Sequence, residues 1–156
     1  MLSNKKKEET RKFMIFTMGN LNFALAIDNV VRIIPIPQIH RSGDKLLGIA
    51  TYENQEVLVI DLYKHIYGQE IDQKISITNK GFLVIFSKQT GLYGITIATL
   101  PNVEDVPVQS VQPLPAEYRD RDSLGIASHM MQASIKKSEP QTVFLLDTEL
   151  LLQLAA

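Results

Sequence analysis

The chain has 156 residues, of which 45% are hydrophobic and 21% charged, as expected for one folded domain or two small subdomains around a shared core. With 16 basic and 17 acidic residues the net charge is −1, so no overall field favours nucleic acid or an anionic membrane. The sequence contains no cysteine, which excludes disulfides, thiolate catalysis and cysteine-bound metal and agrees with a reducing compartment.

The N-terminal residues 1–11 are polar, and we expect them to form a flexible tail. No apolar segment with a small-residue cleavage site follows them, so they do not resemble a secretory signal. The apolar runs elsewhere are far shorter than the roughly 20 residues that cross a bilayer. We therefore expect a cytoplasmic protein without membrane insertion.

Two apolar runs, residues 13–18 and 21–27, flank Gly19-Asn20, which predicts a first hairpin. Apolar residues then recur at helical spacing from Ile27 to Ile34, which favours a short helix that ends at Pro35. A polar loop, residues 38–45, follows.

The next unit is the most regular stretch of the chain. Apolar runs at residues 46–50 and 57–60 flank a polar connection centred on Asn54-Gln55, which predicts a second hairpin. The second run is apolar at every position, so we expect both of its faces to be covered. Asp61 then precedes a short amphipathic segment that ends at Gly68, the pattern of an Asp-capped helix.

The second half begins after a polar connection, residues 69–80. It is expected to contain a hairpin, an extended proline-rich edge segment, a charged turn, a short strand, a polar turn, a buried strand and a second Asp-capped helix start. These segments lie at residues 82–97, 101–115, 117–122, 124–127, 134–141, 143–146 and 147–151.

The order of these segments repeats that of the first half, which indicates an internal duplication. Leu47-Gly48-Ile49-Ala50 recurs as Leu124-Gly125-Ile126-Ala127, and the run that ends at Asp61 recurs as the run that ends at Asp147. We therefore predict two β units of about five strands, at about residues 12–68 and 81–152, and structural roles for Asp61, Asp147 and Gly125. Each unit has a thin core alone, so an apolar junction should join them, and a groove between them could receive a partner.

Catalytic chemistry is not evident in the sequence. The three histidines at positions 40, 65 and 129 are isolated, and the eight glycines form no phosphate-binding loop. We expect no enzyme activity, no metal and no cofactor. Two alternatives of other classes are a small enzyme that works through Asp61 and a nucleic-acid binder that uses Lys5–Lys7 and Arg11, and the charge balance argues against the second.

The order of these blocks, with Val30-Val31-Arg32-Ile33, Leu47-Gly48-Ile49, Val57–Leu62 and Tyr93-Gly94-Ile95, resembles the CheW-like domain over roughly residues 12–153. This resemblance implies a mainly β fold of two small five-stranded SH3-like barrels on a shared apolar junction, with short helices, in a single domain over residues 12–156. It also implies a non-enzymatic adaptor of bacterial chemosensory signalling. Its partners would be the regulatory domain of a CheA-type histidine kinase and the cytoplasmic tip of chemoreceptors.

The resemblance also implies partner-binding positions, which are Arg32, Gly48, Tyr52, Glu53 and Asn54. In the family's hairpin an arginine stands where this chain has Glu53 and a glycine where it has Asn54, while Arg32 stands in place of a glutamate. Ala98 replaces a further family aspartate. We therefore expect a scaffold with altered partner specificity. The alternative is a divergent regulator of motility or gene control that binds no receptor.

Overall fold

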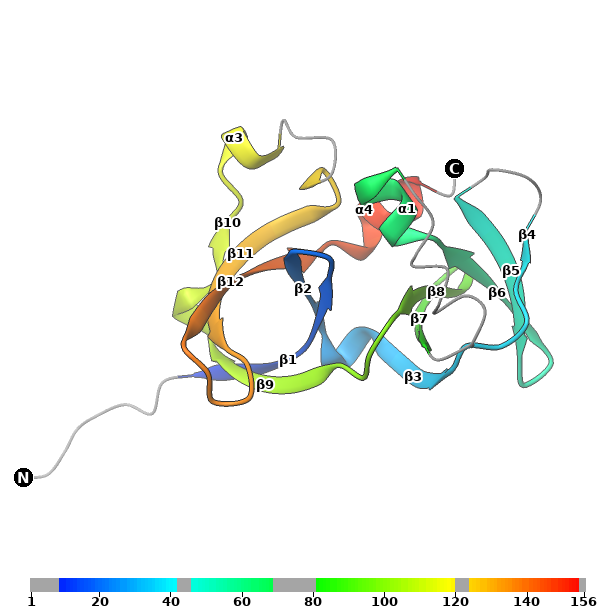
Figure 1. Ribbon diagram of the computed structural model, residues 1–156, viewed down its shortest axis with the longest axis horizontal. Helices are drawn as coiled ribbons and strands as arrows, with labels where there is room; N and C mark the ends of the chain where they lie inside the picture. Colours follow the sequence, from blue (N-terminus) through cyan, green and yellow to red (C-terminus); the bar gives the residue numbers. More distant parts are fainter. Residues whose placement is uncertain (1–8, 42–45, 69–80, 120–123, 155–156) are drawn as a thin grey trace, which may run out of the picture.

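Two six-stranded β-sheets form the molecule in the computed structural model, which describes residues 9–41, 46–68, 81–119 and 124–154 (Figure 1). In chain order the elements are β1 (Thr10–Met18), β2 (Leu21–Ala26), η1 (Ile27–Asn29), β3 (Val30–Pro35), β4 (His40–Arg41), β5 (Leu47–Tyr52), β6 (Gln55–Ile60), α1 (Leu62–Tyr67), β7 (Phe82–Lys88), β8 (Gly91–Ile97), β9 (Asn102–Pro107), η2 (Val108–Ser110), β10 (Gln112–Pro113), α3 (Ala116–Arg119), β11 (Ala127–Ser134), β12 (Pro140–Leu146) and α4 (Thr148–Gln153). The predicted mainly β fold with short helices is confirmed.

The two sheets have the same topology. One, which we call the terminal sheet, has the strand order β10-β11-β12-β2-β1-β9, and the other, the central sheet, has the order β4-β5-β6-β8-β7-β3. In each sheet one pair is parallel, β12 with β2 and β6 with β8, and the other pairs are antiparallel. This correspondence confirms the internal duplication. Each sheet has six strands instead of the expected five because a two-residue strand, β4 or β10, is added at one edge.

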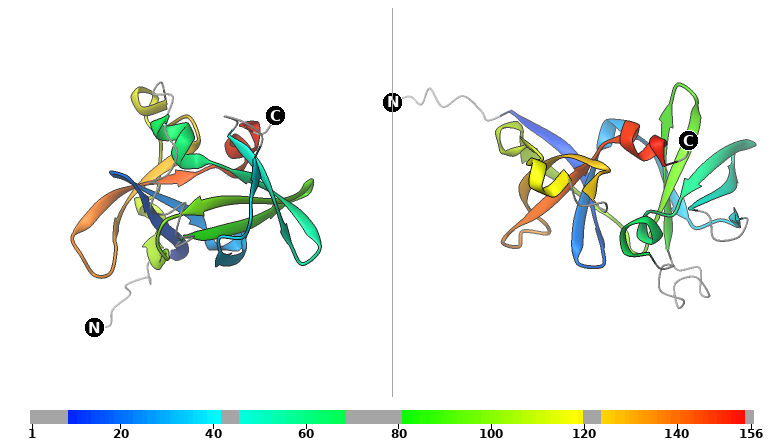
Figure 2. Two further views of the ribbon diagram at one scale, coloured as in Figure 1. Left: turned by 45° about the vertical axis from the view of Figure 1, so that its right-hand side comes forward. Right: turned by 90° about the horizontal axis from the view of Figure 1, so that it is seen from above.

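The halves of the chain exchange their first hairpins. Hairpin β1–β2 lies in the terminal sheet with β9–β12, and hairpin β7–β8 lies in the central sheet with β3–β6. The sheets therefore do not coincide with the two expected barrel ranges, about 12–68 and about 81–152. The exchange is reciprocal, so each sheet is completed by a hairpin from the other half (Figure 2).

Three hydrophobic clusters explain why the exchanged hairpins are apolar on both faces. In β1, Met14 and Phe16 join a large cluster shared by both sheets, while Phe13 and Ile15 join a cluster inside the terminal sheet. Strand β7 divides its side chains in the same way between the shared cluster and one inside the central sheet. The shared cluster is the expected apolar junction. Because side chains alternate along a strand, each exchanged hairpin packs on two clusters at once.

Several local predictions need correction. The expected helix over residues 27–34 is only the short η1 followed by β3, because its β-branched residues favour a strand. The expected tail of residues 1–11 overlaps β1, which begins at Thr10, and its residues 1–8 lie outside the described part. The expected charged turn over residues 117–122 includes part of helix α3, and its residues 120–122 also lie outside the described part.

The equivalence of Asp61 and Asp147 is confirmed, whereas that of Gly48 and Gly125 is wrong. Each aspartate follows an inner strand, and its backbone N donates to the residue before the paired strand, to Leu46 O at 2.8 Å or Ile126 O at 2.9 Å. Gly48 pairs with Val59 in the central sheet, and the corresponding pair in the terminal sheet is His129 with Leu145. Gly125 is exposed in a turn before β11, so the short strand expected over residues 124–127 is wrong except for its last residue, Ala127.

Candidate functional site

The β5–β6 hairpin ends in a tight, exposed turn that contains two of the predicted partner-binding residues. Its two central residues are Glu53 and Asn54, with φ values of 48° and 66°, and the residues before and after them, Tyr52 and Gln55, are paired. The turn is thus one residue earlier than expected. Positive φ at both positions is typical of the type I′ hairpin turn, in which Asn-Gly is the favoured sequence. Glu53 is an unfavourable residue here, because a left-handed conformation costs a residue with a Cβ atom roughly 1–2 kcal/mol.

The equivalent β11–β12 hairpin ends in a longer connection, residues 135–139, that also contains two left-handed residues but has the opposite charge. Its left-handed residues are Lys136 and Lys137, with φ values of 53° and 61°, and both side chains are exposed. In Figure 1 and both views of Figure 2 the β5–β6 and β11–β12 hairpins project from opposite ends of the molecule. The acidic tip carries Glu53 and Glu56. The basic tip carries Lys136, Lys137 and Glu139, and Glu104 of β9 lies beside it.

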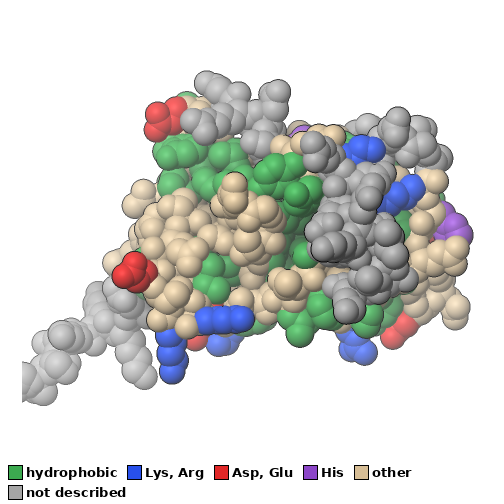
Figure 3. Space-filling model, viewed as in Figure 1, with side chains coloured by type: hydrophobic (Ala, Val, Ile, Leu, Met, Phe, Trp, Pro, Cys, Tyr) green, Lys and Arg blue, Asp and Glu red, His purple; other side chains and the backbone are tan. Residues whose placement is uncertain are grey.

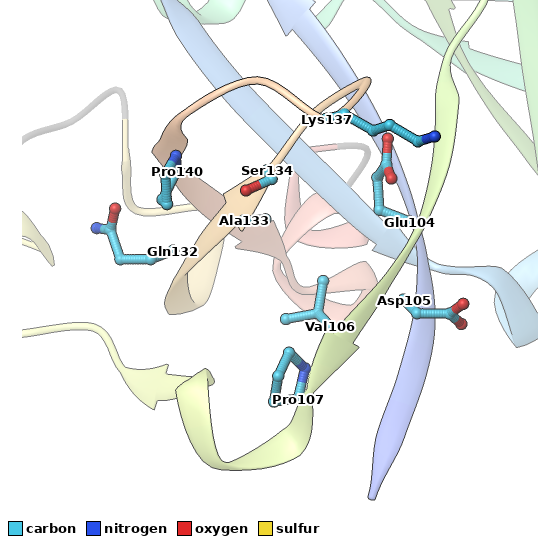
Figure 4. Close-up of a pocket in the computed structure, with 9 residues that line it drawn as sticks. All are labelled: Glu104, Asp105, Val106, Pro107, Gln132, Ala133, Ser134, Lys137 and Pro140. Carbon is cyan, nitrogen blue, oxygen red and sulfur yellow. The ribbon is translucent and has the colours of Figure 1, made fainter. Parts of the chain in front are cut away.

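A cavity of about 360 Å³ lies between β9 and the basic hairpin (Figure 4). The backbone N of Lys136 donates to Glu104 Oε2 at 3.0 Å, which ties the hairpin turn to β9. Figure 4 shows Glu104 and Lys137 pointing toward one another and Asp105 pointing away, where Lys12 Nζ donates to Asp105 Oδ1 at 3.0 Å. The acidic groups of this cavity therefore have structural partners, and we assign them no catalytic role.

Asp61 has the predicted capping role and a second role that sequence analysis missed. Its Oδ1 accepts a hydrogen bond from the backbone N of Lys64 at 3.0 Å, and its Oδ2 accepts one from Arg41 Nη1 at 2.6 Å. The Asp61 side chain is 3% exposed, so the ion pair with β4 supplies the counter-charge that a buried carboxylate needs. Asp147 also caps its helix, by accepting from Glu149 N at 2.8 Å, but it forms no ion pair within the described residues.

The remaining predicted residues do not lie together. Gly48 is buried, and a Cβ atom there would lie 2.6 Å from Ile39 Cγ2, so this glycine lets the chain around β4 pack closely on β5. Arg32 is exposed on β3, at the opposite edge of the central sheet from β4, with β7, β8 and β6 between it and β5. The structure therefore brings together Tyr52, Glu53 and Asn54 at the hairpin tip. Gly48 lies farther along β5, and Arg32 lies on the edge strand β3.

The apolar junction reaches the surface near the helices. Figure 3 shows hydrophobic side chains gathered over β10 and β11 and toward α1 and α4. The partly buried residues that pack there on the shared cluster include Tyr63, Tyr67, Tyr118, Met130 and Leu152. Tyr67 also links the sheets, because its hydroxyl donates to Met18 O at 2.7 Å and accepts from Asn20 N at 3.1 Å.

The described residues contain no group of three or more histidine, aspartate or glutamate side chains that could hold a metal ion. Within the same part of the chain, no helix is long and apolar enough to span a membrane.

Comparison with known proteins agrees with this architecture. The family model described as "CheW-like domain" matches residues 12–156. Among solved structures, the chain is similar to the scaffolding protein TtCheW from Thermoanaerobacter tengcongensis, with a TM-score of 0.70 and 12% sequence identity. The match covers 94% of this chain and 90% of that one. A search of curated protein sequences gives no match.

Proposed function

Because this chain belongs to the CheW-like domain family, we propose that it is a non-enzymatic scaffold that links a CheA-type histidine kinase to chemoreceptor tips or related partners in the cytoplasm. The observation that carries the proposal is the pair of equivalent hairpins whose turns have opposite charge and lie at opposite ends of the molecule. A scaffold must hold two partners at once, and two separate, chemically different tips provide two docking points.

Charge complementarity decides which partner meets which tip. Apposed opposite charges speed association, whereas apposed like charges suppress wrong partners. The tip with Glu53 and Glu56 suits a basic surface, and the tip with Lys136 and Lys137 suits an acidic one. Neither glutamate side chain forms an ion pair or hydrogen bond within the described residues, so both carboxylates are available to a partner.

Two charge-reversed variants test this arrangement. Glu53→Lys should weaken binding of one partner, and the double variant Lys136→Glu with Lys137→Glu should weaken binding of the other, each by about tenfold or more, since tenfold is about 1.4 kcal/mol. The measurement is calorimetric titration with the kinase regulatory domain and with a receptor-tip fragment, followed by light scattering of the three-component mixture. Failure to form a three-component complex, or loss of the same partner in both variants, would refute the two-ended scaffold.

A second candidate function is a regulator of motility or gene control that binds no receptor. It is favoured by Arg32 and Glu53, whose charges are opposite to those that the family resemblance implies. The double variant Arg32→Glu with Glu53→Arg should then strengthen binding to a conventional receptor tip or kinase domain and weaken binding to the native partner. Because Arg32 lies on β3 and Glu53 lies in the β5–β6 turn, with β7 and β8 between β3 and β6 in the sheet, their single effects should add. If no affinity changes by more than about 0.5 kcal/mol, the contact surface lies elsewhere.

A further inference from the structure

Because the two sheets have the same topology, equivalent positions at the end of each internal cluster can be compared. In the central sheet two glycines, Gly48 and Gly81, stand at this end and are covered by two isoleucines. An added Cβ atom would lie 2.6 Å from Ile39 Cγ2 at Gly48 and 2.5 Å from Ile36 Cδ1 at Gly81. The isoleucine side chains thus occupy the space that larger residues would need, and this end is closed.

In the terminal sheet the same positions carry large basic residues. His129 pairs with Leu145 as Gly48 pairs with Val59. Arg11 pairs with Val106. In the central sheet Gly81 holds the position of Arg11, and its backbone O accepts a hydrogen bond from Ile36 N at 3.1 Å. Valines stand where the central sheet has the two isoleucines. Val106 corresponds to Ile36, and both are followed by a proline. Val111 corresponds to Ile39, and both directly precede a two-residue strand.

These replacements leave a cavity of about 270 Å³, which we call the η2 pocket. Its lining residues are Arg11, Phe13, Val108, Val111, His129 and Leu145. Four of them are apolar, and Phe13, Val111 and Leu145 belong to or pack on the cluster inside the terminal sheet. The pocket therefore has an apolar base with a guanidinium and an imidazole among its walls.

The basic groups of the η2 pocket are available to a ligand. The Arg11 guanidinium lies 5.7 Å from the centre of the Phe13 ring, and its nearest acidic partner is the exposed Asp28, with Nη2 and Oδ2 3.8 Å apart. That distance is too long for a hydrogen bond, so the planar donors of Arg11 remain free to bind a carboxylate. His129 Nδ1 lies 2.7 Å from Ser128 Oγ; when that hydroxyl donates, Nε2 carries the hydrogen and is a second donor.

We propose that the η2 pocket binds a small carboxylate with an apolar body. Arg11 and His129 hold the carboxylate, and the apolar body packs on Phe13, Val111 and Leu145. Ligand pockets combine mainly apolar walls with a few polar groups in this way. Among the described residues of the central sheet, Ile36 and Ile39 fill the equivalent space, so the site would give the two similar halves different properties.

The test is a titration of the full chain with benzoate and with the uncharged benzamide, followed by amide NMR shifts. Benzoate should give saturable shifts at Phe13, Val111 and Leu145 with a millimolar dissociation constant, and benzamide should bind at least about tenfold more weakly, a difference of about 1.4 kcal/mol. Arg11→Gln should cause a similar loss, while Arg32→Gln, which removes an exposed arginine on the other sheet, should cause none.

Val108→Phe provides a second variant, because this half-exposed residue can be enlarged without disturbing the buried cluster, and it should block benzoate. Isovalerate serves as a second carboxylate with a branched body. The proposal is overturned if neither carboxylate gives saturable shifts, if benzoate and benzamide bind equally, or if Arg11→Gln and Arg32→Gln behave alike. Because none of these readouts involves a kinase or receptor, the result is independent of the scaffold function.

Discussion

Removal of the Asp61 carboxylate should destabilise the protein more than removal of its equivalent, Asp147. Both side chains cap a six-residue helix, and loss of a cap costs about 0.5–2 kcal/mol. Asp61 also accepts the hydrogen bond from Arg41, and a bond to a charged group contributes about 1.5–3 kcal/mol. The Arg41 side chain is 32% exposed, so water replaces part of this pairing after the substitution. We expect a loss of about 2–4 kcal/mol for Asp61→Ala and about 0.5–2 kcal/mol for Asp147→Ala.

Urea denaturation followed by circular dichroism measures both losses, and Arg41→Gln completes a double-mutant cycle with Asp61→Ala. The cycle should give a coupling energy of about 1–2 kcal/mol between the two side chains. Equal losses for the two alanine variants, together with a coupling energy near zero, would refute the stabilising role of the ion pair and leave capping as the only contribution of Asp61.

Three further changes test other parts of the fold. Gly48→Ala should cost about 1–3 kcal/mol in denaturant melts, because its Cβ atom would clash with Ile39, and an unchanged midpoint would contradict the close packing around β4. Changing Glu53-Asn54 to Asn-Gly should stabilise the hairpin by about 0.5–1.5 kcal/mol while weakening partner binding; a loss of stability would show that the turn is not type I′. Tyr67→Phe removes two hydrogen bonds to the β1–β2 turn and should cost about 1–2 kcal/mol, with faster amide exchange at Asn20 as the local readout.

Local structure was predictable wherever short-range patterns determine it. The hairpins around residues 19–20, 53–54 and 89–90 follow from apolar runs that flank polar turn residues, and the α1 helix follows from Asp61 and Gly68. Gly68 has a φ of 71°, the left-handed stop that glycine permits.

The exchange of hairpins could not be predicted, because it depends on which distant strands pair. Strand β1 has the same apolar pattern whether it pairs within its own half or with β9, and nothing local distinguishes the two. The identical Leu-Gly-Ile-Ala stretches also suggested a wrong alignment of the two halves. The first stretch begins β5, whereas the second lies before β11 and only its last residue, Ala127, belongs to that strand.

The candidate site was predictable in part. Tyr52, Glu53 and Asn54 do share one hairpin tip, but a sequence shows no distance between β3 and β5, and so it could not show that Arg32 lies apart. Arg41 was missed because a cation in a polar loop follows no periodic pattern. The buried run that ends at Asp61 was the one available signal, since a carboxylate at such a position needs a counter-charge.

The reciprocal exchange of hairpins also determines the order in which the protein can fold on the ribosome. The central sheet uses residues 30–97 and can pair as soon as β8 has emerged, whereas β1 must wait for β9, which it meets in the register Thr10 to Pro107. During that interval the β1–β2 hairpin lacks its partner strands β9 and β12, and the nascent chain is a candidate for chaperone binding. Crosslinking of ribosome-bound chains stalled before and after synthesis of β12 would show whether the first strands to be made are among the last to be protected.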